Sequence, residues 1–447
     1  MRAFIASSIG VTCAAALTLP LAAPAGAAPD TPAHSTTAGS VPAEASEPAA
    51  LPGSTQSLAM SPLSTASARA PGQPGLAAAG QGLAERDVRA FSMVGVVWDD
   101  VNAELHGTAQ VRTRAAGTGR WSGWQDLETH NAEHSADTGT PERDSGAARG
   151  STAPLWVGDS DGVEVRVNPE APDTRDASAT PVPLPAGLHL ELVDPGKDPQ
   201  EVRGEDRATT GAAGADRAVE QGAAALPALS RAATDEAAGY APGAAPYIGP
   251  RPRIITRKGW GADEKLREKA FAYTSTVKAA FIHHSATGNN YSCSQAPSVL
   301  RGIYRYHVKS SGWRDIGYNF AVDKCGNIYE GRAGGVTKAV MGAHTLGFNT
   351  NTMGIAVLGT FTNSNPPAAA VTAVAKLTAW KLGLFKANPK GKVTLVSGGS
   401  NKYKKGKKVS LNVISGHRDG FATECPGARL YKKLGTARTS SAKLQGR

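Results

Sequence analysis

The sequence predicts an α/β protein with a mixed central sheet flanked by helices, preceded by a smaller β-rich domain and by disordered linkers. Three observations support this class. From residue 250 onward, segments with strand and helix patterns alternate along the chain. Residues 85–195 instead contain short, partly alternating apolar and polar runs separated by Gly, Asp and Pro. The remaining stretches are rich in Ala, Pro, Ser, Thr and Gly and contain few large apolar residues.

The first 27 residues have the composition of a secretory signal peptide. Arg2 gives a positive start, an uncharged apolar run follows, and residues 25–27 are small enough for a signal peptidase. Pro20 and Pro24 interrupt the run, which favours a cleaved signal over the alternative of a retained membrane helix. No other segment approaches the ~20 apolar residues that span a bilayer. We therefore expect a secreted, wall-associated monomer without a membrane span after cleavage.

The next three segments differ sharply in composition. Residues 28–84 are expected to be a disordered spacer, because their small side chains cannot offset the entropy cost of folding. Residues 85–195 should form antiparallel strands in a small β-sandwich of unknown role. Trp121 and Trp124 are expected in its core rather than in a sugar-stacking site. Residues 196–249, which are rich in Ala and charge, are expected to be a second linker.

The segment 250–438 is expected to form the α/β domain, and residues 439–447 a basic tail. Its predicted elements are, in order, a buried strand at 279–284, a helix capped by Ser294, a hairpin at 318–330, a strand at 352–360, a helix opened by Pro366 and Pro367, and a strand at 411–414. The strand at 279–284 ends in His283 and His284, at the edge where open α/β sheets carry functional side chains.

The charge is divided unevenly between the two parts of the chain. Residues 251–447 hold 32 of the 48 Lys and Arg but only 8 of the 38 Asp and Glu, a balance of +24. Residues 1–250 carry the opposite balance of −14. A basic domain favours an anionic partner, and export makes anionic wall polymers a better candidate than nucleic acid. The acidic domain could also dock on the basic one and compete with its partner.

Two histidines and one cysteine could form a metal site. Cys13 leaves with the signal, so an odd number of cysteines remains in an oxidising compartment and one of them needs another role. His283, His417 and Cys425 together make a known ligand set of catalytic zinc, which leaves a fourth position for water. Spacing alone leaves open the alternative that the two histidines are packed or hydrogen-bonded structural residues.

Several motifs now carry a resemblance to a known family. They are, in chain order, Phe281-Ile282-His283-His284-Ser285-Ala286-Thr287, Ile316-Gly317-Tyr318-Asn319-Phe320, Ile328-Tyr329-Glu330-Gly331-Arg332, Gly342-Ala343-His344-Thr345-Leu346-Gly347-Phe348-Asn349, Gly416-His417-Arg418-Asp419 and Thr423-Glu424-Cys425-Pro426-Gly427. Residues 250 to about 437 thereby resemble the peptidoglycan recognition protein and type-2 N-acetylmuramoyl-L-alanine amidase family. The resemblance implies Zn²⁺ held by His283, His417 and Cys425, and hydrolysis of the amide between N-acetylmuramic acid and L-alanine in peptidoglycan.

The resemblance also implies roles for further residues. Tyr318 matches the active-site tyrosine of the family, and Thr423 occupies a position where relatives carry lysine or threonine, so both are expected to assist catalysis. His344, Asn349 and Arg332 match positions lining the substrate groove. Glu330 could assist proton transfer or be an exposed strand-end carboxylate, and Asp419 is expected to fix the loop around His417.

The two remaining cysteines are expected to pair with each other. Cys293 and Cys325 are expected to form a disulfide between the helix start and the hairpin turn, closing a loop of 32 positions.

A non-catalytic wall-binding module is the first alternative to a zinc amidase, although such family members often lack the cysteine that this chain keeps. The second is a metal-free amidase with Cys425 as nucleophile and His417 as base.

Overall fold

The computed structural model describes residues 53–63, 80–171, 182–198, 223–244 and 246–447. The predicted signal peptide lies outside these ranges. Among the described residues, no helix combines the length and apolar character needed to cross a membrane.

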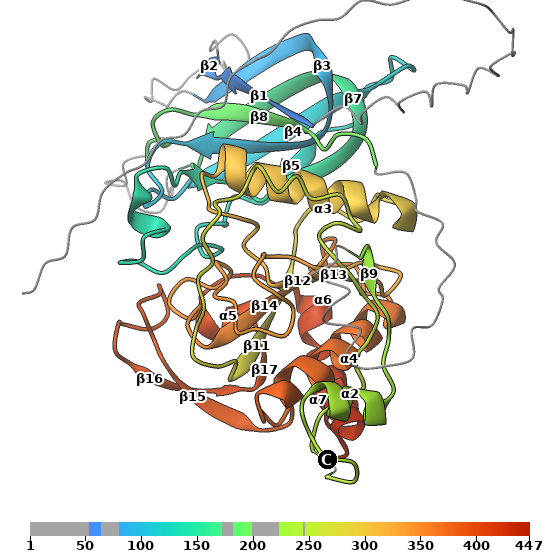
Figure 1. The fold of residues 1–447 in the computed structure, drawn as a ribbon. Coiled ribbons are helices and arrows are strands. Elements are labelled where there is room, and N and C mark those ends of the chain that lie inside the picture. The colour runs from blue at the N-terminus through green and yellow to red at the C-terminus, as the bar shows by residue number, and fades with distance from the viewer. Residues whose placement is uncertain (1–52, 64–79, 172–181, 199–222, 245) are drawn as a thin grey trace, which may run out of the picture. The chain divides into compact units, whose positions relative to one another are not determined.

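The described strands of the predicted β-rich domain form one hydrogen-bonded antiparallel sheet (Figure 1) that encloses a buried core of its own. The strand order is β1-β8-β3-β7-β4-β5, and β2 and β6 pair with β3 beside this path. The strands are β1 (Ser54–Ala59), β2 (Ser61–Pro62), β3 (Gln81–Trp98), β4 (Gly107–Ala115), β5 (Gln125–Leu127), β6 (Gly150–Ser151), β7 (Leu155–Pro169) and β8 (His189–Asp194), with a short 3₁₀ turn, η2 (Arg143–Ser145), before β6.

Three segments that were predicted to lack structure contain helices or strands. Strands β1 and β2 lie in the predicted spacer 28–84, and β1 is paired with β8 along its whole length. The predicted linker 196–249 contains β9 (Ala225–Leu226) and α2 (Arg231–Ala237), and the predicted tail belongs to α7 (Leu434–Gln445). For the described residues of these segments the predictions were wrong, because backbone hydrogen bonds and packing from distant segments supply the stability that local composition lacks. The rest of the predicted spacer and linker lies outside the described residues.

The two tryptophans expected in the β-rich core lie at its margin instead. Trp121 and Trp124 are half-buried, and Arg166 stacks over the Trp124 ring at 4.1 Å from its centroid. The apolar core is built around other large side chains, among them the fully buried Trp98 and Phe91 of β3. Alternation along a strand places a residue on a face, but whether another layer covers that face is decided by the rest of the chain.

The C-terminal domain has the predicted mixed α/β fold. Its seven-stranded sheet has the order β17-β11-β14-β12-β13-β10-β9, with parallel and antiparallel pairs. The strands besides β9 are β10 (Ile254–Ile255), β11 (Ala279–His284), β12 (Phe320–Val322), β13 (Ile328–Glu330), β14 (Thr352–Val357) and β17 (Ile414–Gly416), and a separate hairpin is formed by β15 (Lys392–Val396) and β16 (Lys408–Asn412).

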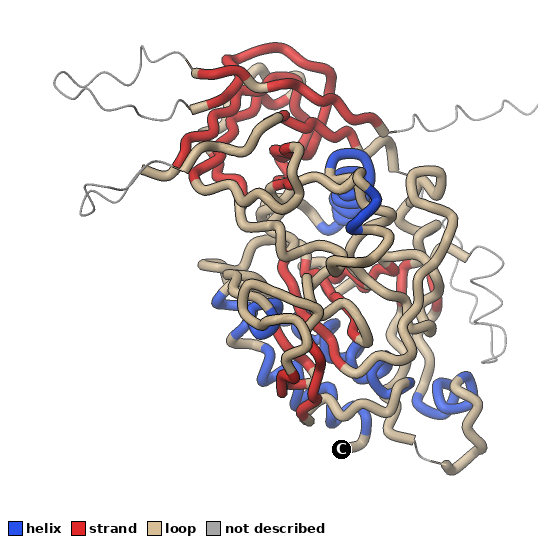
Figure 2. Tube along the Cα trace, turned by 90° about the vertical axis from the view of Figure 1, so that its left-hand side faces the viewer, coloured by secondary structure: helices blue, strands red, loops and turns tan. Residues whose placement is uncertain are grey.

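Helices cover both faces of this sheet (Figure 2). They are η3 (Cys293–Gln295), α3 (Ala296–Arg305), the π-helical turn η4 (Tyr306–Ser310), α4 (Ala368–Leu384), α5 (His417–Gly420), α6 (Ala428–Tyr431) and α7. Alternate residues of β14 serve the two faces: Ile355 and Val357 join the core with α4, whereas Ala356 joins the core with α3. This two-residue period directs one side of each central strand away from α4 and towards the site described below.

The β-rich sheet and the C-terminal domain share an apolar core. Met93 and Val97 of β3 lie in the same buried cluster as Leu300 and Ile303 of α3. The hydroxyl of Tyr306, just after α3, donates to the carbonyl oxygen of Val96 at 3.2 Å. Helix α3 thus contacts the central sheet on one side and the β-rich sheet on the other.

Candidate metal centre

Two parallel strands bring the first two candidate ligands together. His283 lies near the carboxyl end of β11, and His417 directly follows the neighbouring strand β17. Because Ile282 is paired with Gly416, the two histidines leave the same edge of the sheet side by side. Their ring centroids are 4.5 Å apart, and both side chains are fully buried.

Cys425 reaches the same point from the loop after α5. Its backbone carbonyl accepts a hydrogen bond from the Arg418 N–H, and its sulfur lies 3.8 Å from His283 Nδ1. Asp419 fixes the start of this loop as expected, since its carboxylate accepts from the Gly416 N–H at 2.9 Å. The structure therefore brings together all three residues that the sequence suggested as ligands.

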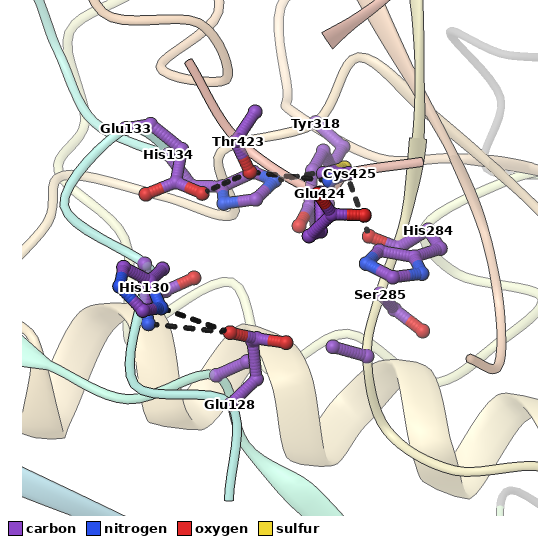
Figure 3. Close-up of a pocket in the computed structure, with 13 residues that line it drawn as sticks. Glu128, His130, Glu133, His134, His284, Ser285, Tyr318, Thr423, Glu424 and Cys425 are labelled. Atoms are coloured by element: carbon purple, nitrogen blue, oxygen red, sulfur yellow. Dashed lines mark hydrogen bonds and ion pairs between the residues drawn. The ribbon is translucent and has the colours of Figure 1, made fainter. Parts of the chain in front are cut away.

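A third histidine, which makes a fourth candidate ligand, comes from the β-rich domain and was not among the residues suggested by the sequence. His134 lies between β5 and β6, its Nε2 is 3.6 Å from the Cys425 sulfur, and its ring centroid is 4.4 Å from that of His417. Figure 3 shows His134 beside Thr423, Tyr318 and Cys425. The only local signal was a histidine in an otherwise polar segment, which does not predict a contact with residues 149 or more positions away.

The four side chains fit a tetrahedral zinc site. One ligand atom from each of His134, His283, His417 and Cys425 lies within 4.8 Å of all the others. Zinc bonds of about 2.0–2.3 Å require ligand atoms roughly 3.3–3.8 Å apart in a tetrahedron, close to the sulfur-to-nitrogen distances here. Both ring nitrogens of His417 are buried without a hydrogen-bond partner, and a cation bound to one of them would relieve part of this costly arrangement.

The protonation states of the three histidines and of Cys425 also bear on whether the site can bind a cation. Burial lowers the pKa of His283 and of His417 well below its usual value and that of His134 to about 3, so all three rings are neutral and can act as ligands. Burial raises the pKa of the Cys425 thiol well above its ordinary value. A cation at the centre of the group would offset that cost and favour the thiolate.

His344 lies behind the ligand cluster rather than on an accessible groove. It is fully buried, and its Nδ1 lies 3.3 Å from His283 Nε2 and 3.0 Å from the Thr345 hydroxyl. The predicted substrate contact therefore does not fit this structure. A partner on the second ring nitrogen fixes the orientation of a ligating histidine, and this is the role that the geometry supports for His344.

Tyr318 and Thr423 border the site. Tyr318 is buried, its ring centroid lies 5.5 Å from that of His283, and burial raises its pKa well above the usual value, so the phenol is a neutral donor. The Thr423 hydroxyl donates to Glu133 at 2.7 Å and accepts from the Cys425 N–H at 3.1 Å. Thr423 thus orients the cysteine loop and also contacts the β-rich domain.

Asn349 and Arg332, two predicted groove residues, contact the segment that carries His134. The Asn349 amide donates to Asp137, and the Arg332 guanidinium forms a two-pronged ion pair with Glu142 at 2.7 and 2.8 Å. Glu330, a possible proton-transfer group, is instead buried and accepts from the Arg257 N–H.

The predicted disulfide between Cys293 and Cys325 is present and ties η3 to the turn between β12 and β13.

Comparisons with known proteins place the C-terminal domain in a family. Residues 273–428 match the family model described as N-acetylmuramoyl-L-alanine amidase. "Peptidoglycan-recognition protein SC2" of Drosophila simulans is 32% identical over 185 residues, which cover 41% of this chain and 85% of that protein. The chain belongs to the peptidoglycan recognition protein and type-2 amidase family. Its relative "Peptidoglycan-recognition protein LB" of Drosophila melanogaster is 30% identical over 41% of this chain and 67% of its own.

Two further comparisons concern the solved structures and the β-rich domain. The structure titled "Drosophila PGRP-LB wild-type" is 27% identical over 41% of this chain and 93% of its own, with a TM-score of 0.33. Residues 40–186 match a family model described as "Rv3811 N-terminal galactose-binding domain-like". Membership of the recognition-protein and amidase family supports a function related to peptidoglycan.

Proposed function

We propose that this protein is an exported, zinc-dependent hydrolase that cleaves the amide between N-acetylmuramic acid and L-alanine in peptidoglycan. The observation that carries the proposal is the buried group of His283, His417 and Cys425, in which the ring nitrogens of His417 have no hydrogen-bond partner. Two imidazoles and a thiolate are also a known ligand set of catalytic zinc, which favours a hydrolase over a protein that only binds the wall. The proposed place of action is the cell wall, where the basic domain would meet anionic polymers.

The reaction needs a nucleophile and stabilisation of negative charge. Water adds to the amide carbonyl, the carbon–nitrogen bond breaks, and the products are a carboxylate on the sugar side and a free L-alanine amine. A zinc ion held by these ligands would lower the pKa of a water and polarise the carbonyl. The chain's own groups must then hold the substrate, exclude bulk water and supply hydrogen bonds to the developing charge.

Tyr318 and His344 have distinct parts in this scheme. Because its pKa is raised, the Tyr318 phenol keeps its proton at neutral pH and can donate to the tetrahedral oxyanion. His344 holds the His283 ring through the nitrogen that faces away from Cys425. Thr423 acts one step further away, by accepting from the Cys425 N–H and so fixing the sulfur.

Mass spectrometry of digested walls tests the proposal. Purified peptidoglycan is incubated with excess full-length protein for many hours, so that slow turnover is also detected. New L-alanine amino termini should appear without new reducing sugar ends, and a chelator should abolish them until zinc is restored. New reducing ends would indicate a glycosidase and contradict the proposal, and metal-free cleavage would favour Cys425 as a nucleophile.

Cysteine variants give a matched comparison of metal content. Cys425→Ser should bind zinc more weakly and lose amide cleavage, because a serine hydroxyl is a poor replacement for the thiolate. Replacing both Cys293 and Cys325 by serine removes cysteines that lie in the disulfide and should leave stoichiometric zinc in place. If Cys425→Ser keeps both its metal and full activity, the proposed centre is wrong.

A further inference from the structure

A segment of the β-rich domain lies over the metal centre. We name residues 128–149, between β5 and β6, the covering loop. Its middle part is buried rather than solvent-exposed: Glu133, His134 and Ser135 are each 5% exposed or less. Backbone contacts hold it as well, since the Leu346 N–H donates to the Glu133 carbonyl and the Arg149 N–H to the Ser311 carbonyl. The loop is therefore packed into the C-terminal domain.

His134 stands where a catalytic zinc site normally keeps an open position. Catalytic zinc has three protein ligands and one water or substrate, whereas a site with four protein ligands is closed. The three ligands suggested by the sequence are His283, His417 and Cys425, and His134 places a fourth ligand atom within 4.8 Å of each. We propose that His134 is a fourth protein ligand of the zinc and that the covering loop keeps the hydrolase in a closed, latent state. The regulatory part of this inference rests on the proposed function.

The space beside the cluster agrees with a closed site. The cavity bordered by His134, Tyr318 and Cys425 has a volume of about 10 Å³, and Figure 3 shows the side chains that line it. This is room for about one water molecule. Sites for organic ligands typically enclose roughly 300–1,000 Å³, so a sugar-linked peptide cannot enter while the loop is in place.

Three carboxylates of the covering loop accept hydrogen bonds from residues to which the family resemblance assigns roles in substrate binding or catalysis. Glu133 accepts from Thr423, Asp137 from the Asn349 amide, and Glu142 from both ends of the Arg332 guanidinium.

Each of these bonds would have to break before an acidic stem peptide could use the same donor. The acidic N-terminal part of the chain thus competes with an acidic substrate at specific residues, beyond a general attraction between opposite charges.

The shared core around α3 explains how the covering loop is held in place over the metal centre. The loop begins just after β5 and ends at β6, which pairs with β3, and β3 contributes Met93 and Val97 to the core with α3. The sheet is therefore anchored to the catalytic domain independently of the loop. The site could open in two ways: the covering loop alone could leave, or the whole β-rich sheet could separate from α3. Movement of the loop alone exposes less buried apolar surface.

Cobalt spectroscopy of the full-length protein tests the fourth ligand without relying on turnover. Cobalt(II) is loaded into the wild type, His134→Ala, His134→Gln and the control His106→Ala, whose ring is exposed in the same domain. Loss of His134 should change the ligand-field bands and let added azide shift them, whereas the wild type and His106→Ala should not respond to azide. Zinc affinity, measured by competition with a chromophoric chelator, should fall at least tenfold in both His134 variants.

The outcomes separate the two proposals. Unchanged bands and unchanged zinc affinity in both His134 variants would overturn the fourth-ligand inference, whatever the activity. If the variants bind azide and also cleave peptidoglycan at least tenfold faster than the wild type, closure and function are both supported. If they bind azide but cleave nothing, the ligand inference stands and the proposed function fails. Agreement between the Ala and Gln variants excludes misfolding caused by one substitution.

Discussion

The ion pair between Glu142 and Arg332 allows a quantitative test of how the covering loop is held. Both side chains are buried, with 7% and 6% of their surfaces exposed, and two hydrogen bonds of 2.7 and 2.8 Å join them. Removing one partner of such a pair leaves an uncompensated buried charge and typically costs about 3–5 kcal/mol. We therefore expect Glu142→Gln to lower the free energy of unfolding by about 3 kcal/mol, since glutamine keeps some hydrogen bonding.

A double-mutant cycle separates the pair from its surroundings. Arg332→Met should cost more than Glu142→Gln, because the Arg332 Nε also donates to the Ile316 carbonyl at 2.8 Å. The double variant should be less destabilised than the sum of the singles, with a coupling energy of about 2–3 kcal/mol. Urea unfolding monitored by tryptophan fluorescence supplies the four free energies.

An exposed pair provides the matched control. Glu268 and Arg314 are joined in the same domain, but 53% and 21% of their side chains are exposed. Glu268→Gln should cost less than about 1 kcal/mol. If Glu142→Gln costs no more than Glu268→Gln, Glu142 is not buried in solution, and the inference that the covering loop packs on the C-terminal domain is refuted.

The same pair predicts a pH dependence. Burial raises the pKa of Glu142, but the Arg332 charge and its hydrogen bonds outweigh burial and hold that pKa below the ordinary 4.5. A lowered carboxyl pKa means that the stabilisation is complete above pH 4.5 and is lost as the pH falls through the folded-state value. The stability difference between wild type and Glu142→Gln should therefore shrink on acidification below pH 4.5.

Three further predictions concern other parts of the chain. Burial lowers the pKa of Lys381 to about 7, so stability should rise between pH 7 and 10 by at most about 5 kcal/mol, and Lys381→Met should abolish this rise in urea titrations. Reducing Cys293–Cys325 should lower stability by about 3–4 kcal/mol, because it frees a loop of 32 positions; comparing oxidised and reduced protein by calorimetry checks this. A Cβ on Gly95 would lie 2.3 Å from the Tyr306 hydroxyl oxygen, so Gly95→Ala should cost about 1–3 kcal/mol in thermal unfolding; unchanged stability would contradict close packing of β3 on η4.

Much of the C-terminal domain could be predicted because its signals are local. The apolar run that ends in His283 forms β11 as expected, and the segment around Tyr318 begins the predicted hairpin β12–β13. In both cases the period of apolar residues matches the element that forms. Three of the four candidate ligands could also be predicted from the sequence. His283 and His417 lie at the ends of predicted strands, and Cys425 was the cysteine left without a disulfide partner.

The errors have a common physical origin. Residues 54–62 look like a spacer, but β1 gains a complete set of partners from β8, 130 or more positions later. His344 has the pattern of a groove residue, yet the fold places it behind His283. Contacts between distant segments decide both cases, and no local periodicity reports them.

The amino-acid sequence by itself determined the mixed α/β class of the C-terminal domain, its family and three candidate zinc ligands. These follow from hydrophobic periods and from residue types that the chemistry requires. Only the tertiary structure decided that His134 lies among those residues and that Glu133, Asp137 and Glu142 contact Thr423, Asn349 and Arg332. The reason is that a loop's position depends on the surfaces to which it is anchored, here the shared core around α3, and not on its own sequence pattern.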